Sequence, residues 1–289
     1  MSSFFDRYNP NNFVNRYQDL SNEEWLDVMK QSVTSPEIDN LNFPGFPPEE
    51  IQIMWVGVAG VAGVQHSFEF YKDIHSLAEK LDFPIGRQTK LLDFGCGWGR
   101  HIRYFLKDIP YCNIYGVDPN QNIIGYCMND VKYGNFTHTP YMPKLHFDDD
   151  SFDLIYSFSV FSHLSEMAAN AWFSELNRIL RPGGMVVFTV RDNQFINEIE
   201  HMKRPEANIT DYQQTLIDTF GDTDRLRERY ENGEHIYFAT HQSNEIKDIY
   251  GDAIIPPAYI EKNLSTMFSR IESLPTTVTR NQAVWGMIK

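Results

Sequence analysis

The stretch Leu91-Leu-Asp-Phe-Gly-Cys-Gly-Trp-Gly-Arg100 places three glycines directly after a short apolar run. A glycine-rich turn between a strand and a helix lets the backbone come close to a ligand. Gly95, Gly97 and Gly99 are separated by single residues, and Asp93 precedes them. A dinucleotide-binding loop has two residues before its third glycine. The spacing therefore disfavours a nicotinamide-dependent dehydrogenase and favours a ligand without a pyrophosphate.

A second acidic residue follows at the end of the next predicted strand. Asp118 comes about 20 residues after the glycine loop, where a carboxylate can accept hydrogen bonds from ribose hydroxyls. The alternatives are that the glycines only make a turn and that Asp118 only caps the following helix. The two features occur in the right order and at the right spacing, which favours a nucleoside-type ligand.

Short apolar runs alternate with helical patterns along most of the chain. The predicted strands are 90–94, 113–117, 136–138, 154–158, 185–190, 266–273 and 281–288. The predicted helices between or before them are 65–80, 99–107, 120–131, 166–180 and 257–264. This alternation predicts an α/β fold with a seven-stranded, mainly parallel sheet and helices on both faces, in which ligands bind at the carboxyl ends of the strands.

Two segments fall outside this alternation. Residues 1–50 are rich in Asn, Pro and aromatic residues, and Ser21 and Glu24 have the spacing of a helix capping box. We expect an N-terminal helical arm or lid over 1–50, which ends in the extended cluster 42–48, and a main domain over 51–289. The polar stretch 192–234 predicts a helical insertion, so we place an insertion or cap at about 192–240.

Composition limits the partners. The 289 residues carry a net charge of −14, which repels nucleic acid and anionic lipid. The longest apolar run, 55–64, is too short to span a bilayer, and the N-terminus lacks a signal pattern, so we expect a cytoplasmic protein with no membrane or nucleic-acid partner. Three cysteines without a pairing pattern predict reduced thiols. Asp148-Asp-Asp150 predicts a solvated turn, and we expect no metal. The sequence does not indicate an oligomeric state.

The ordered motifs resemble those of the class I S-adenosylmethionine-dependent methyltransferases, over roughly residues 51–289. The loop at 93–99 is similar to the family's D/E-x-G-x-G-x-G motif, and Asp118 matches its ribose-binding acid. Residues 143–153 are similar to the L-P-F-x-D-x-S-F-D segment, with His146 in place of the usual proline, and Leu180-Arg-Pro-Gly-Gly184 resembles the turn before the fifth strand. The resemblance implies S-adenosylmethionine as cofactor, with S-adenosylhomocysteine as product, and an antiparallel last strand.

The same resemblance implies the cofactor-binding residues. Those around the glycine loop are Asp93, Gly95, Cys96, Gly97, Trp98, Gly99 and Arg100, with Arg100 either paired to the methionine carboxylate or in a surface salt bridge. The others are Asp118, Pro119, Tyr141, Met142 and Ser159, of which Tyr141 and Met142 would lie along the adenine.

Methyl transfer is a displacement at an electrophilic methyl group, so a base is needed only when the acceptor arrives protonated. His163 follows the fourth strand and is the candidate base, because a free imidazole titrates near neutral pH. The alternative is that His163 only orients a helix start. Phe158 and Trp98 are candidates to line the substrate pocket, whereas Phe161 is expected in the core.

Residues 54–63 form a strip of small and apolar residues before the first long helix. We expect Trp55 and Gly57 to close over the cofactor and acceptor as a lid, and the alternative is a buried strip on the sheet. The sequence thus predicts transfer of a methyl group to an O, N or C nucleophile of a small molecule. A regulatory protein that binds the cofactor without turnover remains the alternative, since methyl transfer requires no fixed catalytic side chain.

Overall fold

A computed structural model describes residues 9–204, 209–240, 246–277 and 281–289. Seven strands form one sheet in the order β10-β11-β7-β6-β3-β4-β5. β3 (Leu91–Phe94) is parallel to β4 (Ile114–Asp118) and β6 (Phe152–Ser157), and β4 is parallel to β5 (Asn135–His138). β11 (Ala283–Ile288) is antiparallel to both neighbours, β10 (Arg270–Leu274) and β7 (Leu180–Val190). The predicted α/β class and the antiparallel last strand are confirmed.

The chain divides into two compact units, and each is described by itself. The first contains residues 1–140 and 150–156, and the second contains residues 141–149 and 157–289.

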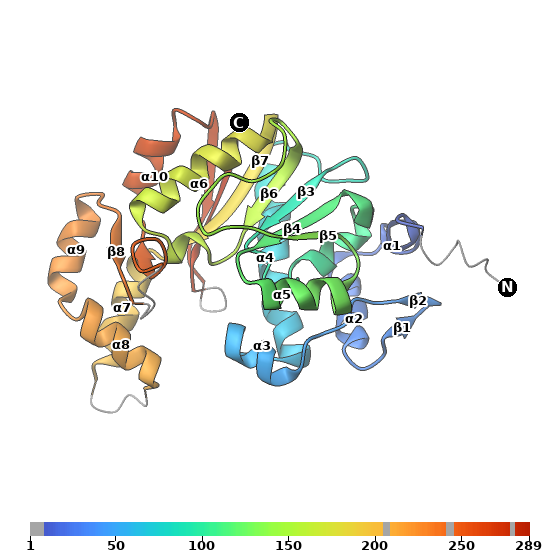
Figure 1. The fold of residues 1–289 in the computed structure, drawn as a ribbon, viewed down its shortest axis with the longest axis horizontal. Coiled ribbons are helices and arrows are strands. Elements are labelled where there is room, and N and C mark those ends of the chain that lie inside the picture. The colour runs from blue at the N-terminus through green and yellow to red at the C-terminus, as the bar shows by residue number, and fades with distance from the viewer. Residues whose placement is uncertain (1–8, 205–208, 241–245, 278–280) are drawn as a thin grey trace. The chain divides into compact units, whose positions relative to one another are not determined.

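β3, β4 and β6 have buried residues on both faces, as parallel strands covered by helices do. All four residues of β3 are buried, and Asp93 lies opposite Gly116 of β4 and Tyr156 of β6. α5 (Gln121–Tyr126) packs on β4 and β5, and Figure 1 shows this green helix beside the two strands. The carboxyl ends of β3 and β4 therefore lead into neighbouring loops at one edge of the sheet.

Two helical predictions in the first unit need correction. The segment after the glycine loop is the 3₁₀-helix η2 (Ile102–Lys107), not a helix from residue 99, because Gly97 and Gly99 both have positive φ, at 51° and 77°. The predicted helix 120–131 changes after α5 into the π-helix η4 (Cys127–Val131). A single π turn inside a helix shifts the side chains that follow it, and sequence periodicity does not reveal it.

The small-residue strip 54–63 is also more helical than predicted. It is divided between α3 (Glu49–Val56) and α4 (Gly60–Lys80), so the long helix begins five residues earlier than the predicted 65. Gly57 ends α3 in the left-handed conformation, with φ of 76°. A glycine at this position ends a helix at little steric cost.

The N-terminal segment of the first unit contacts the rest of that unit through aromatic side chains. α1 (Asn12–Tyr17), the short strands β1 (Glu37–Ile38) and β2 (Leu41–Asn42), and α2 (Asn22–Ser32) precede α3. The predicted capping box of α2 is confirmed, since the Ser21 hydroxyl accepts from the Glu24 amide. The indole of Trp25 donates to the carbonyl of Tyr104 at 2.9 Å, which attaches α2 to η2.

In the second unit, α6 (Glu166–Ile179) packs on β7. The hydroxyl of Ser165, the residue before the helix, caps its N-terminus. The 3₁₀-helix η5 (Phe161–His163) lies between β6 and α6 in the chain. Phe161 is fully buried and stacks on Phe173 with ring centroids 4.0 Å apart, so its expected place in the core is confirmed. α10 (Pro257–Leu264) agrees with the predicted bounds, whereas β10 begins at Arg270 instead of residue 266.

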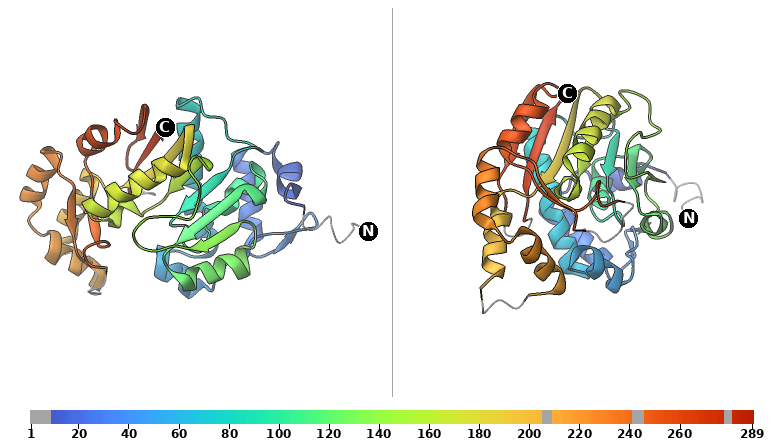
Figure 2. Two further views of the ribbon diagram at one scale, coloured as in Figure 1. Left: turned by 45° about the horizontal axis from the view of Figure 1, so that its top comes forward. Right: turned by 60° about the vertical axis from the view of Figure 1, so that its left-hand side comes forward.

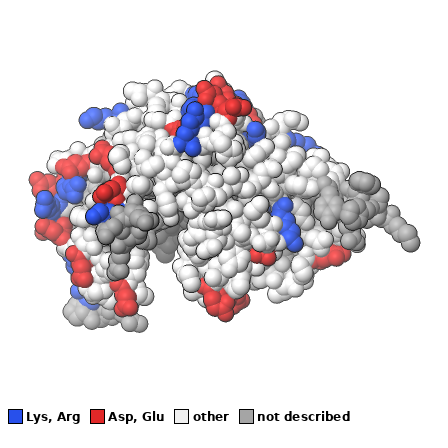
Figure 3. Space-filling model, viewed as in Figure 1, with Lys and Arg blue, Asp and Glu red and all other residues white. Residues whose placement is uncertain are grey.

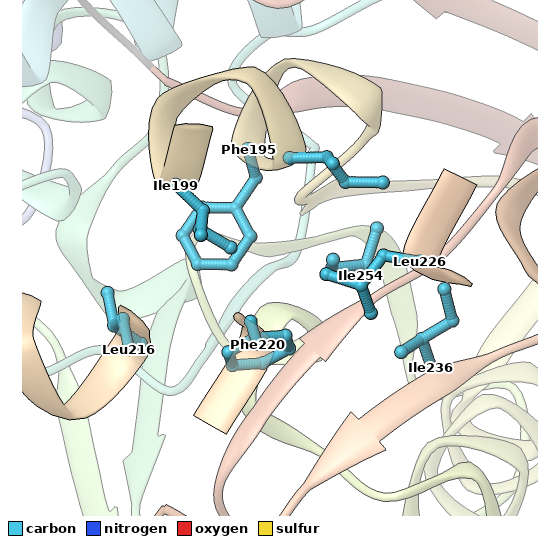
Figure 4. Close-up of a cluster of buried hydrophobic side chains, with 8 residues drawn as sticks. Phe195, Ile199, Leu216, Phe220, Leu226, Ile236 and Ile254 are labelled. Atoms are coloured by element: carbon cyan, nitrogen blue, oxygen red, sulfur yellow. The ribbon is translucent and has the colours of Figure 1, made fainter. Parts of the chain in front are cut away.

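The polar stretch after β7 is helical, as predicted. α7 (Asn193–Met202), α8 (Asp211–Phe220) and α9 (Thr223–Glu231) precede the antiparallel pair of β8 (Ile236–Phe238) and β9 (Asp252–Ile254). These five elements share one apolar cluster, drawn in Figure 4, which consists of Phe195, Ile196, Ile199, Leu216, Phe220, Leu226, Ile236 and Ile254. The helices stay grouped in both views of Figure 2, and Figure 3 shows acidic and basic side chains mixed over α9.

The described residues include no helix that is both long and apolar enough to cross a membrane. Cys96 and Cys127 are buried and Cys112 is exposed.

Candidate functional site

The glycine loop is attached to the end of β4 by backbone hydrogen bonds. The amides of Gly95 and Cys96 both donate to the carbonyl of Val117, at 2.8 and 3.0 Å. Gly99 approaches the π-helix closely, since a Cβ there would lie 3.0 Å from a methyl carbon of Val131. At Gly97, by contrast, a Cβ would meet nothing within 4 Å. Gly97 therefore faces open space, and its positive φ favours glycine.

The predicted acid of the second strand closes this loop. Oδ2 of Asp118 accepts from the amide of Gly97 at 3.0 Å, and Oδ1 accepts from the amide of Asn120 at 2.8 Å. Burial raises the pKa of Asp118, and the two backbone hydrogen bonds oppose that shift. Each carboxylate oxygen has a further lone pair, so the same group can accept a ligand's hydroxyls. The helix-cap alternative is wrong, because the Asn120 side chain caps α5.

Asp93, at the end of β3, is fully enclosed. Its Oδ2 accepts from the hydroxyl of Tyr156 at 2.9 Å, and the side chain is 1% exposed. Burial raises the pKa of Asp93 to about 8, although the hydrogen bond from Tyr156 acts in the opposite direction. Asp93 is therefore mainly protonated at neutral pH, a state that the sequence did not indicate.

Trp98, within the glycine loop, and Arg100, directly after it, have different neighbours. The guanidinium of Arg100 lies 3.2 Å from Nδ1 of His66, and burial lowers the pKa of Arg100 to about 10. Trp98 is 3% exposed, and its ring lies beside the guanidinium of Arg103 and the ring of Phe46. Arg103 also donates to the carbonyl of Gly45 at 2.9 Å. Trp98 is thus part of the packing beneath the loop, and Arg103 is a structural contact that the motifs did not reveal.

The proposed lid residues occur at the end of α3. Trp55 is 47% exposed, and its neighbours Ile53 and Met54 are 53% and 73% exposed. Gly57 follows them with open space around its Cβ position. The alternative of a strip buried on the sheet is therefore wrong for these three side chains.

In the second unit, the two residues predicted to lie along the adenine are consecutive in a loop. Tyr141 is 38% exposed and its carbonyl accepts from the indole of Trp172 at 3.0 Å, while Met142 is half-buried. Ser159 has φ of 59°, and its amide donates to Oγ1 of Thr189 at 2.7 Å. Phe158 is half-buried beside it. In the first unit, the carbonyl of Pro119 lies 3.1 Å from Nε2 of His138.

His163 is enclosed by groups of the second unit. Its Nδ1 lies 2.8 Å from the carbonyl oxygen of Gly251 and 3.3 Å from Oδ1 of Asp252. The imidazole also stacks on the ring of Tyr250, with centroids 5.2 Å apart. The hydroxyl of Ser165, two residues after His163, caps α6. Gly251 and Asp252 lie almost 90 residues further along the chain, and no motif marked them.

The sequence profile of a methyltransferase domain matches residues 91–184, which contain the loop, Asp118 and His163. Residues 91–184 therefore form a segment similar to S-adenosylmethionine-dependent methyltransferase domains. Its resemblance to that family at the glycine loop is thereby confirmed.

Individual methyltransferases match over part of their length. The chain is 29% identical to an uncharacterized methyltransferase of Schizosaccharomyces pombe over 112 residues, 35% of this chain and 40% of that protein. It is also 29% identical to a phosphoethanolamine N-methyltransferase of Plasmodium falciparum over 111 residues, 37% of this chain and 41% of that protein. The chain thus matches about two-fifths of the length of these curated relatives.

A solved methyltransferase structure resembles the whole chain loosely. The 1,6-didemethyltoxoflavin-N1-methyltransferase of Burkholderia thailandensis, solved with its substrate and S-adenosylhomocysteine, has a TM-score of 0.48 and 14% identity. The similarity covers 93% of this chain and 91% of that one.

The first unit of the chain fits a nucleoside cofactor at two points. Open space at Gly97 leaves room for a ligand against the backbone, and Asp118 presents buried carboxylate oxygens beside it. Both features lie at the carboxyl ends of neighbouring strands, where parallel α/β sheets bind ligands.

Proposed function

We propose that this chain transfers the methyl group of S-adenosylmethionine to a nucleophilic atom of a small molecule. The observation that carries the proposal is the pairing of Asp118 with the open glycine loop at Gly97, within residues matched by the methyltransferase profile. When bound, the cofactor supplies an electrophilic methyl group, and the chain's own residues bind, orient and exclude water.

Each group at the loop has a distinct task in this proposal. The Asp118 carboxylate accepts the ribose hydroxyls while it holds the loop through the Gly97 amide. The backbone at 95–99 lies along the methionine end, and Arg100 provides a cation for its carboxylate. Tyr141 and Met142 cover the adenine, with Pro119 and Ser159 completing the contacts that the family resemblance implies.

His163 is the proposed base for acceptors that arrive with a proton. Its chain position supports this, because it comes seven residues after Tyr156, which lies opposite Asp93 in the sheet register. In the chain, the segment that carries His163 thus follows the carboxyl end of β6, as the glycine loop follows the carboxyl end of β3.

The acceptor is proposed to be small and polar. Two curated relatives are named phosphoethanolamine N-methyltransferases, although their matches cover only 37% and 46% of this chain. The net charge of −14 also disfavours a large polyanion such as nucleic acid as the acceptor. Exposed Trp55 and the Gly57 hinge are proposed to cover the acceptor when it binds.

Formation of S-adenosylhomocysteine from S-adenosylmethionine tests the proposal. The full chain would be incubated with the donor and, separately, phosphoethanolamine, other primary amines, phenols and carboxylic acids. We expect product that depends on one acceptor class and is lost in Gly97→Val, whose side chain fills the open face of the loop. Tight binding of the product nucleoside with no turnover on any acceptor would instead support the regulatory alternative.

A further inference from the structure

A polar network in the second unit holds His163 from one side. Asp252, at the start of β9, is 2% exposed and is contacted by the guanidinium of Arg191, which follows β7. The same carboxylate accepts from the hydroxyl of Tyr212 on α8 at 3.1 Å and from Oγ1 of Thr240 at 2.6 Å. Four side chains from separate segments therefore converge on this single carboxylate.

The network fixes which imidazole nitrogen carries the proton. The two polar atoms near Nδ1 of His163, the Gly251 carbonyl at 2.8 Å and the Asp252 carboxylate at 3.3 Å, are both acceptors. Nδ1 must therefore donate, and in the neutral ring the lone pair is on Nε2. The side chain of His163 keeps 19% exposure, so the ring is anchored at Nδ1 and still reaches solvent.

The anchoring extends to the backbone and to the face of the ring. The amide of Gly251 donates to the carbonyl of His163 at 2.7 Å, so the two segments are joined in both directions. Tyr250 stacks on the imidazole with an interplanar angle of 18°. These contacts fix the position and the tilt of the ring.

The charges around His163 nearly balance. The surrounding ionisable groups are Asp252 and Arg191, with the hydroxyl of Tyr212 between them, and Arg191 also donates to the carbonyl of Ser162. Burial would raise the pKa of Asp252, but the hydrogen bond from His163 and the charge of Arg191 hold it well below its usual range. Asp252 is therefore ionised at neutral pH and compensates Arg191.

We propose that Asp252 is a positioning residue that orients His163 with Nε2 free to accept the proton of the methyl acceptor. The inference rests on the proposed function and narrows its substrate class to hydroxyls and protonated amines. In the step, the acceptor's electron pair forms the bond to the methyl carbon, and the carbon–sulfur pair remains on sulfur. The acceptor's proton passes to Nε2 of His163.

The first test uses the wild-type chain and needs no acceptor. Long-range ¹H–¹⁵N NMR spectra of ¹⁵N-histidine-labelled protein, in mildly alkaline solution, distinguish the two neutral imidazole tautomers. The His163 signals are assigned by their loss in His163→Gln. We expect His163 with a protonated Nδ1 and an unprotonated Nε2. The opposite tautomer would overturn the inference even if methyl transfer is confirmed.

The second test compares turnover over a range of pH, with whichever acceptor class supports turnover in the assay proposed for the function. His163→Gln is expected to lower kcat by about 10²- to 10⁴-fold, the usual contribution of general-base catalysis. Asp252→Asn is expected to lower kcat by about tenfold or more. It also moves the acidic limb of the profile to lower pH, because Arg191 is then uncompensated beside the imidazole.

Matched controls separate these effects from general damage to the unit. Asp248→Asn removes an exposed carboxylate four residues away, and His201→Gln removes an exposed histidine on α7; both should keep the wild-type profile. A purely structural role of Asp252 would lower the amount of folded enzyme without moving the acidic limb, and that result would overturn the inference.

The two proposals can fail separately. Calorimetric titration with S-adenosylhomocysteine is carried out on every variant, and the His163 and Asp252 variants should bind it like wild type. If His163→Gln methylates the acceptor as fast as the wild type does, this inference is overturned, while methyl transfer by the chain still stands. Absence of cofactor binding in the wild type would overturn the proposed function, while the NMR result would still decide the orientation of His163.

Discussion

The two carboxylates at the strand ends have different chemical states. Asp118 accepts a backbone hydrogen bond at each oxygen, whereas Asp93 is enclosed with the Tyr156 hydroxyl as its donor. The acceptor oxygens of Asp118 suit ribose hydroxyls, and a protonated buried acid such as Asp93 suits a fixed structural contact. Burial raises the pKa of Asp93 to about 8, against the opposite effect of the hydrogen bond from Tyr156.

Substitution of Asp118 tests the cofactor site at this scale. In Asp118→Asn the negative charge is lost. The side-chain amide nitrogen of the new residue also takes the place of one carboxylate oxygen, so the backbone amide of either Gly97 or Asn120 loses its acceptor. We expect affinity for S-adenosylhomocysteine to fall by about tenfold, or about 1.4 kcal/mol. Isothermal titration calorimetry measures this, with the exposed Asp27→Asn as the control. Equal affinities for both variants would remove Asp118 from the site.

Substitution of Asp93 tests its protonation state through stability. The unfolded pKa is about 4 and the folded pKa is about 8, so between these values the folded state holds one more proton. Wild-type stability should therefore fall as pH rises through this range, by about 1 kcal/mol per unit relative to Asp93→Asn. Urea unfolding of both proteins from pH 5 to pH 8 gives the difference. Parallel curves would show that Asp93 is ionised in the folded chain.

Motifs in the sequence predicted Asp93, Asp118 and His163 because each stands next to a strand end. They did not predict Asp252, since its contact with His163 joins segments almost 90 residues apart and a lone acidic residue has no local pattern. They also did not predict that burial would protonate Asp93. Sequence reasoning thus identified chemical groups, whereas their partners and charge states required the folded chain.

At the scale of elements, apolar runs predicted β3, β4 and β6 well because these strands are short and mostly buried. Helix bounds were less accurate where backbone geometry overrides periodicity. Gly60 and Gly63 suggested a flexible strip, yet α4 includes both, because a glycine in a long helix costs only about 1 kcal/mol. The glycine whose conformation matters is Gly57, between the two helices, with φ of 76°.

A glycine pair tests this interpretation of the α3–α4 junction. Gly57→Ala should lower the free energy of unfolding by about 1 kcal/mol, because its left-handed backbone disfavours a Cβ although the space is open. Gly86→Ala is the matched control, since Gly86 also has open space but no positive φ. It should be neutral or stabilising by up to about 1 kcal/mol. Chemical denaturation of the three proteins gives both values, and an equal response would contradict the assigned hinge conformation.

At the scale of the whole chain, the methyltransferase profile matches the continuous segment 91–184, and several partners of His163 lie outside it. The profile ends at residue 184, whereas Tyr212 lies on α8, Thr240 follows β8 and Asp252 begins β9. We propose that residues 1–50 form an arm or lid and that residues at about 192–240 form a cap. We therefore expect changes in these two segments to alter which substrate is methylated. The proposed cofactor contacts at the glycine loop and the contact of Asp252 with His163 thus involve different stretches of the chain.

Binding of the methyl donor is the central claim. The most direct measurement is calorimetric titration of the full chain with S-adenosylhomocysteine and, in parallel, with NAD. We predict saturable binding of S-adenosylhomocysteine to the wild type, weakened in Asp118→Asn, and no binding of NAD. No heat of binding with S-adenosylhomocysteine at millimolar concentration, or binding of NAD in its place, would contradict the assignment of this glycine loop.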